Sequence, residues 1–368
     1  GDPDPTRPFF NGQEGSGFLV APLAGEFDAI NPARIDGFQI RSADLGSGIF
    51  VNAYADNLVL SNNKLISNKG LTGGGIRVGS PNSTGIAFGI VQEIETSPNS
   101  NINIHHNHVL YNSSWNFGGG IAIHDGADDY NVSNNYICGN RANWGGGGLS
   151  HVGVSDNGLI ANNTIIFNEQ FQGDEIGLGS GGGGVDVFGE PAPATAPAGT
   201  MTKGTGSVKI VANLIQGNMS GAGDGGGINL RNINGQDVED STDPSAPYDD
   251  WWTVEVYNNI IVNNTSGVAG GGIALQDAAQ VRIVHNTIAH NMSIATGALA
   301  FEPGNYGIVS EPQIAGVISR AHSDALDDIL PGGQENYSDP VLDNNILWHN
   351  RSYYWDASVP TASQLVPI

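Results

Sequence analysis

The chain is poor in cysteine, lysine and long apolar runs. It has a single cysteine, Cys138, among 368 residues, so no disulfide can form within it. Charged residues make up 14% of the chain. No apolar stretch is long enough to span a bilayer, which excludes membrane insertion by a helix. No leader peptide is recognisable, and we expect either a removed leader or a fragment of a longer protein.

Positive charge is scarce as well. Lysine and arginine total 13 against 37 aspartates and glutamates, giving a formal net charge of −24. Nucleic acids and anionic membrane surfaces are therefore excluded as favourable partners. This acidity suits a secreted protein in salty or calcium-bearing surroundings, so we expect an extracellular or cell-surface location.

Asparagine and glycine, by contrast, recur in a fixed repeat. The pattern Asn-x-aliphatic-x-x-Asn occurs eight times, the first copy running from Asn63 to Asn68 and the last from Asn345 to Asn350. Six copies are followed by three glycines and an aliphatic residue, from Gly73 onward. The shortest intervals between copies are 27 and 28 residues. A repeat of this size predicts a stacked, one-dimensional architecture.

Each repeat also alternates apolar and polar residues before its first asparagine. The third residue back is always apolar, as in Ile104 and Val132. Period-two alternation predicts a short strand with one buried face. Two further inward points per unit predict three strands and three corners, so the fold is all-β. Nine or ten coils stacked at about 4.8 Å give a rod of roughly 45 Å.

The asparagine columns have a mechanical explanation. Asparagine tolerates the left-handed backbone of a sharp corner, and stacked amides can hydrogen-bond from coil to coil. We expect residues 1–34 to cap the first coil, residues 35–356 to form the rod and residues 357–368 to form a tail leading to further chain. The segment from Ile35 to Ile40 predicts the entry strand.

This pattern resembles the right-handed parallel β-helix superfamily, which includes pectate lyases, polygalacturonases, alginate epimerases and bacterial surface passengers. The Gly-Gly-Gly-aliphatic and aliphatic-x-x-Asn elements are most similar in style to the repeats of polymorphic outer-membrane proteins. The resemblance covers nearly all of residues 35–356 and implies a right-handed parallel β-helix. Repeats of this kind specify architecture better than function.

Insertions follow the strand after the glycine run. Segments 79–100, 187–207, 231–253 and 302–340 all leave at the same corner. Stacked loops on one edge predict a groove beside that strand's sheet, where enzymes and binders of this fold class hold polymers. The alternative is that insertions are simply tolerated at this corner.

Outward residues after the glycine runs predict the floor of that groove. Asp186, Arg231 and His124 are the candidate catalytic residues, because a carboxylate beside arginine and histidine suits acid/base work or binding of a sugar carboxylate. Asn229 and Glu302 are candidate ligand-binding residues in the same columns. The alternative is an ordinary solvated polar sheet face.

The motifs of the named enzymes argue against a direct match. The resemblance implies Asn-x-Asp, Asp-Asp, Gly-His-Gly and Arg-x-Lys for a polygalacturonase, and only the Asp-Asp element has echoes, at Asp128-Asp129 and Asp249-Asp250. Lyases acting on acidic polysaccharides need a basic residue at the floor. None of the four lysines falls there, which leaves Arg231.

Aromatic residues end the third insertion. Tyr248, Trp251 and Trp252 lie beside the predicted groove, and exposed tryptophan next to polar groups suits stacking on sugar rings. The alternative is that these side chains pin the loop to the rod.

Metal binding is weakly indicated. Asp237, Glu239, Asp240 and Asp243 form an oxygen-rich segment that predicts either a solvated acidic loop or a Ca²⁺ site without EF-hand spacing. His105, His106 and His108 share one corner, but neighbouring residues point to opposite sides, a poor geometry for one metal. No other cofactor is expected.

Three functions are compatible with these features. The leading prediction is a binding or structural module that contacts polysaccharide or a surface protein. The alternative is a carbohydrate-active enzyme, lyase-like or epimerase-like, working in the groove. The third is an accessory domain of a larger extracellular metal or redox protein, indicated only by the histidines.

Overall fold

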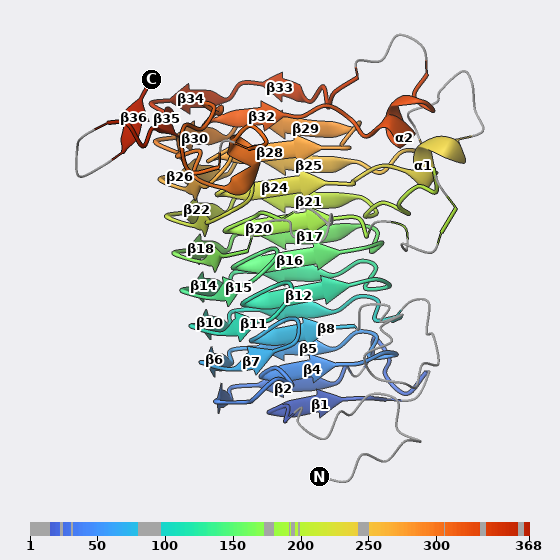
Figure 1. The fold of residues 1–368 in the computed structure, drawn as a ribbon. Coiled ribbons are helices and arrows are strands. Elements are labelled where there is room, and N and C mark those ends of the chain that lie inside the picture. The colour runs from blue at the N-terminus through green and yellow to red at the C-terminus, as the bar shows by residue number, and fades with distance from the viewer. Residues whose placement is uncertain are drawn as a thin grey trace.

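The computed structural model describes most of the chain. Described are residues 15–22, 25–30, 32–79, 97–172, 180–190, 192, 196–197, 199–241, 250–304, 306–331, 336–359 and 364–368. Their strands assemble into four sheets of nine strands each, and within each sheet the strands stack along the axis of the rod (Figure 1). The protein is a parallel β-helix solenoid, as predicted.

Each coil contributes one strand to each sheet, in a fixed order. The strands before the first asparagine column form the leading sheet: β2 (Arg34–Asp36), β5 (Val59–Ser61), β9 (Asn103–His105), β13 (Asn131–Ser133), β17 (Gly158–Ala161), β21 (Val208–Val211), β25 (Val254–Tyr257), β29 (Val281–Val284) and β33 (Val341–Asp343). Those between the two asparagine columns form the asparagine sheet: β3 (Gln39–Arg41), β6 (Lys64–Ile66), β10 (His108–Leu110), β14 (Tyr136–Cys138), β18 (Thr164–Ile166), β22 (Leu214–Gln216), β26 (Ile260–Val262), β30 (Thr287–Ala289) and β34 (Ile346–Trp348).

The other two sheets complete the coil. The strands after the second asparagine form the short-strand sheet: β7 (Lys69–Gly70), β11 (Ser113–Ser114), β15 (Arg141–Ala142), β19 (Glu169–Gln170), β23 (Met219–Ser220), β27 (Thr265–Ser266), β31 (Met292–Ser293) and β35 (Arg351–Trp355). The ninth strand of this sheet is β36 (Leu365–Pro367), which is added beside β35. Those after the glycine runs form the glycine sheet: β1 (Phe18–Val20), β4 (Ile49–Val51), β8 (Ile76–Val78), β12 (Ile121–His124), β16 (Leu149–Val152), β20 (Val185–Phe188), β24 (Ile228–Arg231), β28 (Ile273–Gln276) and β32 (Val317–Ser319).

The two-residue strands are the part of the coil that the three-strand prediction left out. Ser113 and Ser114 of β11 pair in parallel with Arg141 and Ala142 of β15, and the same register continues along the sheet. Strands this short carry too few alternating residues to leave a period-two signal in the sequence. At the end of the chain β36 pairs antiparallel with β35, so the predicted tail folds back on the last coil.

The two asparagine columns stack as predicted. In the first column each side-chain amide donates to the Oδ1 of the next coil's asparagine; Asn135 Nδ2 to Asn163 Oδ1, for example, is 3.0 Å. The same Asn135 Nδ2 donates to the carbonyl of Ile104 one coil back at 2.8 Å, and Asn163 Oδ1 also accepts from the Asn135 backbone N–H at 2.9 Å. All asparagines of the two columns are buried except Asn345 and Asn350 in the last coil, so these bonds satisfy polar groups that water does not reach.

The left-handed backbone, however, falls one residue earlier than predicted. In every coil the residue directly before each ladder asparagine has a positive φ, for example Asn134 at 55° and Tyr111 at 54°. The ladder asparagines themselves do not. Their role is hydrogen bonding, while the preceding residue makes the bend.

The glycine runs turn the chain back upon itself. The third glycine before the aliphatic residue has a positive φ in each run, as at Gly118 with 63°. A Cβ on the last, Gly120, would lie 2.5 Å from the carbonyl oxygen of Gly148 in the next coil. In four successive coils the segment that enters this turn contains Phe117, Gly145, Gly181 or Asp224. These residues form parallel bridges from coil to coil, and we call the stacked segments the arm.

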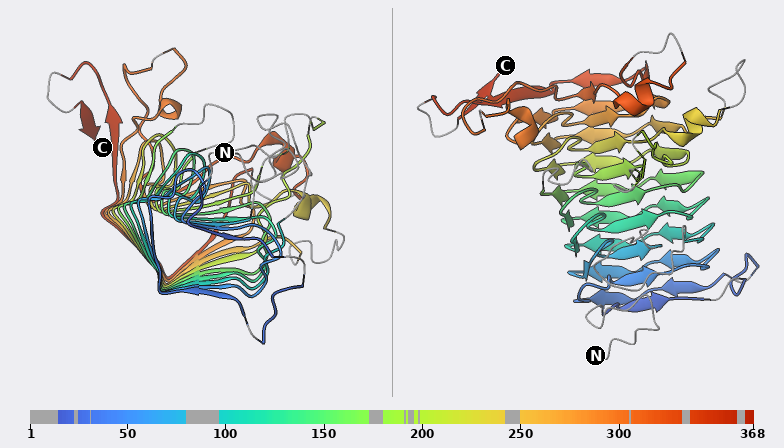
Figure 2. Two further views of the ribbon diagram at one scale, coloured as in Figure 1. Left: turned by 90° about the horizontal axis from the view of Figure 1, so that it is seen from below. Right: turned by 45° about the vertical axis from the view of Figure 1, so that its right-hand side comes forward.

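The two short α-helices lie on one side of the rod. Helices α1 (Gln236–Glu239) and α2 (Asp324–Asp327) lie on this side, whereas the asparagine sheet runs along the opposite edge (Figures 1 and 2). The 3-10 turn η1 (Ala298–Ala300) precedes β32. Aliphatic side chains from the leading, asparagine and glycine sheets fill the lumen as one cluster. No helix within the described residues is long and apolar enough to cross a membrane.

Candidate functional site

Asp186 and Arg231 lie together, as the alternation of residues after the glycine runs predicted. Val185–Phe188 pairs in register with Ile228–Arg231, which places Asn229 beside Asp186. Arg231 Nη2 lies 2.9 Å from Asp186 Oδ2, and Asn229 Nδ2 donates to Asp186 Oδ1 at 3.0 Å. The Arg231 guanidinium also lies over the Phe188 ring, 3.7 Å from its centroid. The three polar side chains form one network on the outer face of the glycine sheet.

That outer face is covered, which overturns the prediction of an open groove floor. Asp186 is fully buried, and Asn229 and Arg231 are 4% exposed. The arm lies over them: a Cβ at Gly145 would overlap Asp186 Oδ2, and one at Gly181 would lie 2.6 Å from Asn229 Nδ2. Burial raises the pKa of Asp186, and the adjacent Arg231 opposes that rise. The network holds the arm onto the sheet and presents no face to a polymer.

His124 does not join this network. It lies on β12, two strands from β20, and is 1% exposed beneath the same arm. Its Nε2 is 2.9 Å from Thr72 Oγ1. Burial, reinforced by the positive charge of Arg77, lowers the pKa of His124 to about 3, so the ring is neutral at physiological pH. The predicted Asp–Arg–His constellation is therefore wrong in its third member.

Glu302 also lies elsewhere. The ninth strand of the glycine sheet is β32, whose Val317 pairs with Ile273. Glu302 lies exposed in the segment between η1 and β32. The glycine run that marks the other coils is reduced to Gly316 before this strand, which is why the column assignment failed.

The two tryptophans of the third excursion have different roles. Trp251 is 4% exposed and packs with Met201, Val238 and Leu326, which belong to three different excursions, so it holds these excursions to one another. Trp252 is half-buried, and its Nε1 donates to the carbonyl of Lys203 at 3.1 Å. Tyr248 lies outside the described residues.

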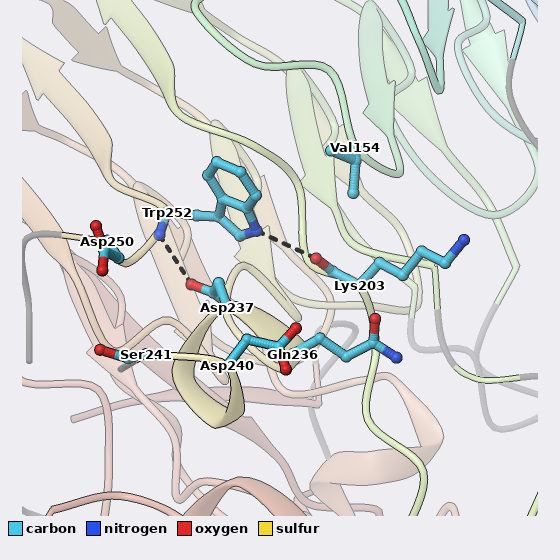
Figure 3. A pocket seen from close by; sticks show the side chains of 8 residues that line it. All are labelled: Val154, Lys203, Gln236, Asp237, Asp240, Ser241, Asp250 and Trp252. Carbon is cyan, nitrogen blue, oxygen red and sulfur yellow. Dashed lines mark hydrogen bonds between the residues drawn. The ribbon is translucent and has the colours of Figure 1, made fainter. Parts of the chain in front are cut away.

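Trp252 lines a pocket of about 410 Å³ between two excursions (Figure 3). The other lining residues are Val154, Lys203, Gln236, Asp237, Asp240, Ser241 and Asp250. Lys203, Asp240 and Asp250 are exposed. One aromatic ring, an ammonium, carboxylates, an amide and a hydroxyl thus share the walls of one open pocket.

Asp237 builds this pocket rather than offering a free carboxylate to it. Its Oδ2 accepts from Asn234 Nδ2 at 2.7 Å and from the Trp252 backbone N–H at 2.8 Å. Its Oδ1 accepts from the Gly235 backbone N–H at 2.6 Å. Burial raises the pKa of Asp237, and these donors oppose the rise. Asp237 therefore ties the start of α1 to the end of the excursion and positions the Trp252 ring.

The predicted metal ligands do not assemble. Within the described residues no group of three histidine, cysteine, aspartate or glutamate side chains is placed to hold a metal ion. This includes Asp237, Glu239 and Asp240, while Asp243 lies outside the described residues. His105 and His106 contact each other, with 2.9 Å between their Nδ1 atoms, and His108 instead packs against Tyr136.

Two acidic residues that interact with the pocket residue Lys203, Asp125 and Glu190, were not identified from the sequence. Asp125 follows β12, and burial together with the charge of Glu190 raises its pKa to about 7. Its Oδ1 is buried without a hydrogen-bond partner. Burial also raises the pKa of Glu190, and the pocket residue Lys203 lowers the pKa of both acids. The sequence signal was faint: Asp125 lies one position beyond the predicted floor columns, opposite Gly153 of the next coil.

Comparison with known proteins adds no further assignment. No family model, no curated protein and no solved structure matches this chain. The pocket and the exposed surfaces of the rod are therefore the features that indicate a function.

Proposed function

We propose that this chain is an extracellular β-helix binding module that holds a carbohydrate in the pocket beside Trp252. The observation that carries the proposal is the combination of this half-buried indole with exposed polar groups in one pocket of about 410 Å³. Pockets of this size accept small ligands, and an indole face packs on the C–H face of a sugar ring.

The polar groups fit hydroxyl recognition. The carboxylates of Asp240 and Asp250 accept hydrogen bonds from sugar hydroxyls, whereas the Lys203 ammonium donates them. The Gln236 amide does both. With two exposed carboxylates against one ammonium, the pocket favours a neutral or amino sugar over a uronate. A surface protein, the other predicted partner, would have to insert a side chain into the same pocket.

The test is binding to a panel of soluble neutral, amino-sugar and uronate oligosaccharides. Trp252→Phe keeps a ring but removes the N–H that donates to Lys203, and Trp252→Ala removes the stacking surface. We expect Trp252→Ala to weaken binding about tenfold or more and Trp252→Phe to weaken it less. Tyr306→Ala, an exposed aromatic remote from the pocket, is the matched control. Equal binding by wild type and a folded Trp252→Ala variant would refute the pocket.

An enzyme is the second candidate, and the Asp125 cluster is the observation that favours it. A carboxylic acid with a pKa of about 7 is suited to general acid/base catalysis at neutral pH. Lys203 connects this acid electrostatically to the pocket. Incubation of the same oligosaccharides with wild type and with Asp125→Asn separates the two functions. Product formed by wild type and abolished in a variant that still binds would establish catalysis, whereas no product would leave a binding module.

A further inference from the structure

The outer face of the asparagine sheet carries no acidic residue, although the protein as a whole is strongly acidic. Its strands and the corner residue after each span nine four-residue segments, from 39–42 to 346–349, and none contains aspartate or glutamate. The chain as a whole carries 37 acidic residues. The only lysine or arginine residues on these segments are Arg41 and Lys64. The face lies opposite the side that carries α1 and α2 (Figures 1 and 2).

The corner column that borders this face carries two exposed aromatic rings. Tyr111 is 64% exposed and Phe167 is 61% exposed. Both have a positive φ, 54° and 53°, a conformation that is unfavourable for bulky residues. Neither burial nor backbone preference therefore explains an aromatic side chain at these two corners. The positive φ itself belongs to the corner, because every coil has it at this position.

A glycine in the next coil makes room for one edge of each ring. A Cβ at Gly139 would lie 2.6 Å from Cδ1 of Tyr111, and a Cβ at Gly217 would lie 2.7 Å from Cε1 of Phe167. Each ring thus overhangs the glycine of the next coil with one edge and stays largely exposed to solvent. The two rings are two coils apart in the same column, about 10 Å at the usual strand spacing.

The surface beside the rings is flat and mixed in character. Tyr136 is 37% exposed and lies opposite Thr164 of the next strand. Ile260 is 49% exposed and lies opposite Leu214 of the strand before it. Between them Thr164 and Gln216 supply hydroxyl and amide groups. Two exposed aromatic rings, with hydrogen-bonding groups alongside, thus lie along one border of this sheet.

We propose that this face is a second binding surface, and that its ligand is an extended, uncharged, β-linked polysaccharide lying along the rod axis. Sugar C–H faces stack on Tyr111 and Phe167, whose separation is of the order of one disaccharide along such a chain. The scarcity of arginine and lysine and the net charge of −24 disfavour an anionic polymer. The surface is independent of the pocket, on the other side of the molecule.

The test compares sedimentation of the whole chain with microcrystalline cellulose and with insoluble chitin, and mobility in gels containing soluble polygalacturonate. Tyr111→Asn and Phe167→Asn remove the rings and introduce a residue that tolerates positive φ; Asn263 already occupies this column. We therefore expect the double variant to fold at least as stably as wild type.

Wild type is expected to sediment with at least one neutral polymer, independently of salt, and not to be retarded by polygalacturonate. The double variant should bind the neutral polymer at least tenfold more weakly. Trp252→Ala, which removes the pocket ring, should bind it like wild type. Failure of wild type to bind either neutral polymer, undiminished binding by the folded double variant, or loss of binding in Trp252→Ala alone would each overturn the proposal.

Discussion

Asp186 and Arg231, on the adjacent strands β20 and β24, form a buried ion pair with 2.9 Å between Oδ2 and Nη2. The arm covers the pair. In two coils the arm and the turn that follows it carry four consecutive glycines, Gly145–Gly148 and Gly181–Gly184. The additional glycine at the start of each run makes room for the Asp186 carboxylate and the Asn229 amide. The pair thus explains a departure in the repeat.

Removing the cation of this pair should destabilise the fold strongly. Arg231→Met leaves the Asp186 carboxylate buried without its ion partner, and we expect a loss of about 3–5 kcal/mol in the free energy of unfolding. Urea denaturation measures the loss. The matched control is Arg141→Met, because Arg141 pairs with Glu169 at 3.5 Å on the exposed surface and should contribute less than about 1 kcal/mol. Similar losses in both variants would refute a special role for the buried pair.

A ladder asparagine should be equally intolerant of truncation. Asn163 donates to the Val132 carbonyl at 2.8 Å and to Asn213 Oδ1 at 3.0 Å. Its Oδ1 accepts from Asn135. Asn163→Ala leaves several buried groups unpaired, at a cost of about 1–3 kcal/mol for each group. Thr164→Ala changes the neighbouring half-exposed side chain and is expected to unfold at nearly the wild-type urea concentration.

Asp125 should make the fold less stable as the pH rises. Its pKa is raised from 3.8 to about 7. Between these values the folded state holds a proton that the unfolded state has lost, so stability falls with increasing pH and the penalty is complete above pH 7. Asp125→Asn should therefore gain stability at pH 7.5, by up to about 4 kcal/mol, and gain little at pH 4. Thermal unfolding at the two pH values decides; an equal gain at both would contradict the buried acid.

His124 should act in the opposite direction. Burial lowers the pKa of His124 to about 3, so between pH 6.5 and pH 3 the unfolded state binds a proton that the folded state does not bind. The stability contributed by neutral His124 is present above pH 6.5 and is lost as the pH falls toward 3. His124→Met should flatten the decline between pH 6 and pH 4 by up to about 1.4 kcal/mol per pH unit. An unchanged slope in urea titrations across this range would show that the imidazole is accessible to protons.

Part of the architecture could be predicted because its causes are local. The Asn-x-aliphatic-x-x-Asn spacing identified both ladders, and alternation identified the lumen-facing residues such as Ile104 and Val132. The fourth strand was missed because Ser113 and Ser114 are too few to alternate. The left-handed corner was predicted one residue too late. Asparagine is suited both to a left-handed backbone and to a hydrogen-bonded ladder, and in this fold the repeated asparagines form the ladder.

The candidate site was less accessible to the same reasoning. Alternation placed Asp186, Asn229 and Arg231 on one outer face, which is correct, but alternation is blind to a segment from the preceding turn lying over that face. Sugar stacking or loop packing was predicted for Trp251 and Trp252 alike; Trp251 is packed in a core, whereas Trp252 lines a pocket. Neighbouring tryptophans carry no sequence signal that separates these roles.

The sequence by itself determined the coil, the ladders and the lumen, because each depends on residues at fixed short spacing and on contacts between equivalent positions. Only the tertiary structure decided which outer faces meet solvent. The glycine sheet is covered and the asparagine sheet is open because the chain doubles back at one set of corners and not at the other. Exposure depends on where distant segments come to rest, and no local periodicity records that.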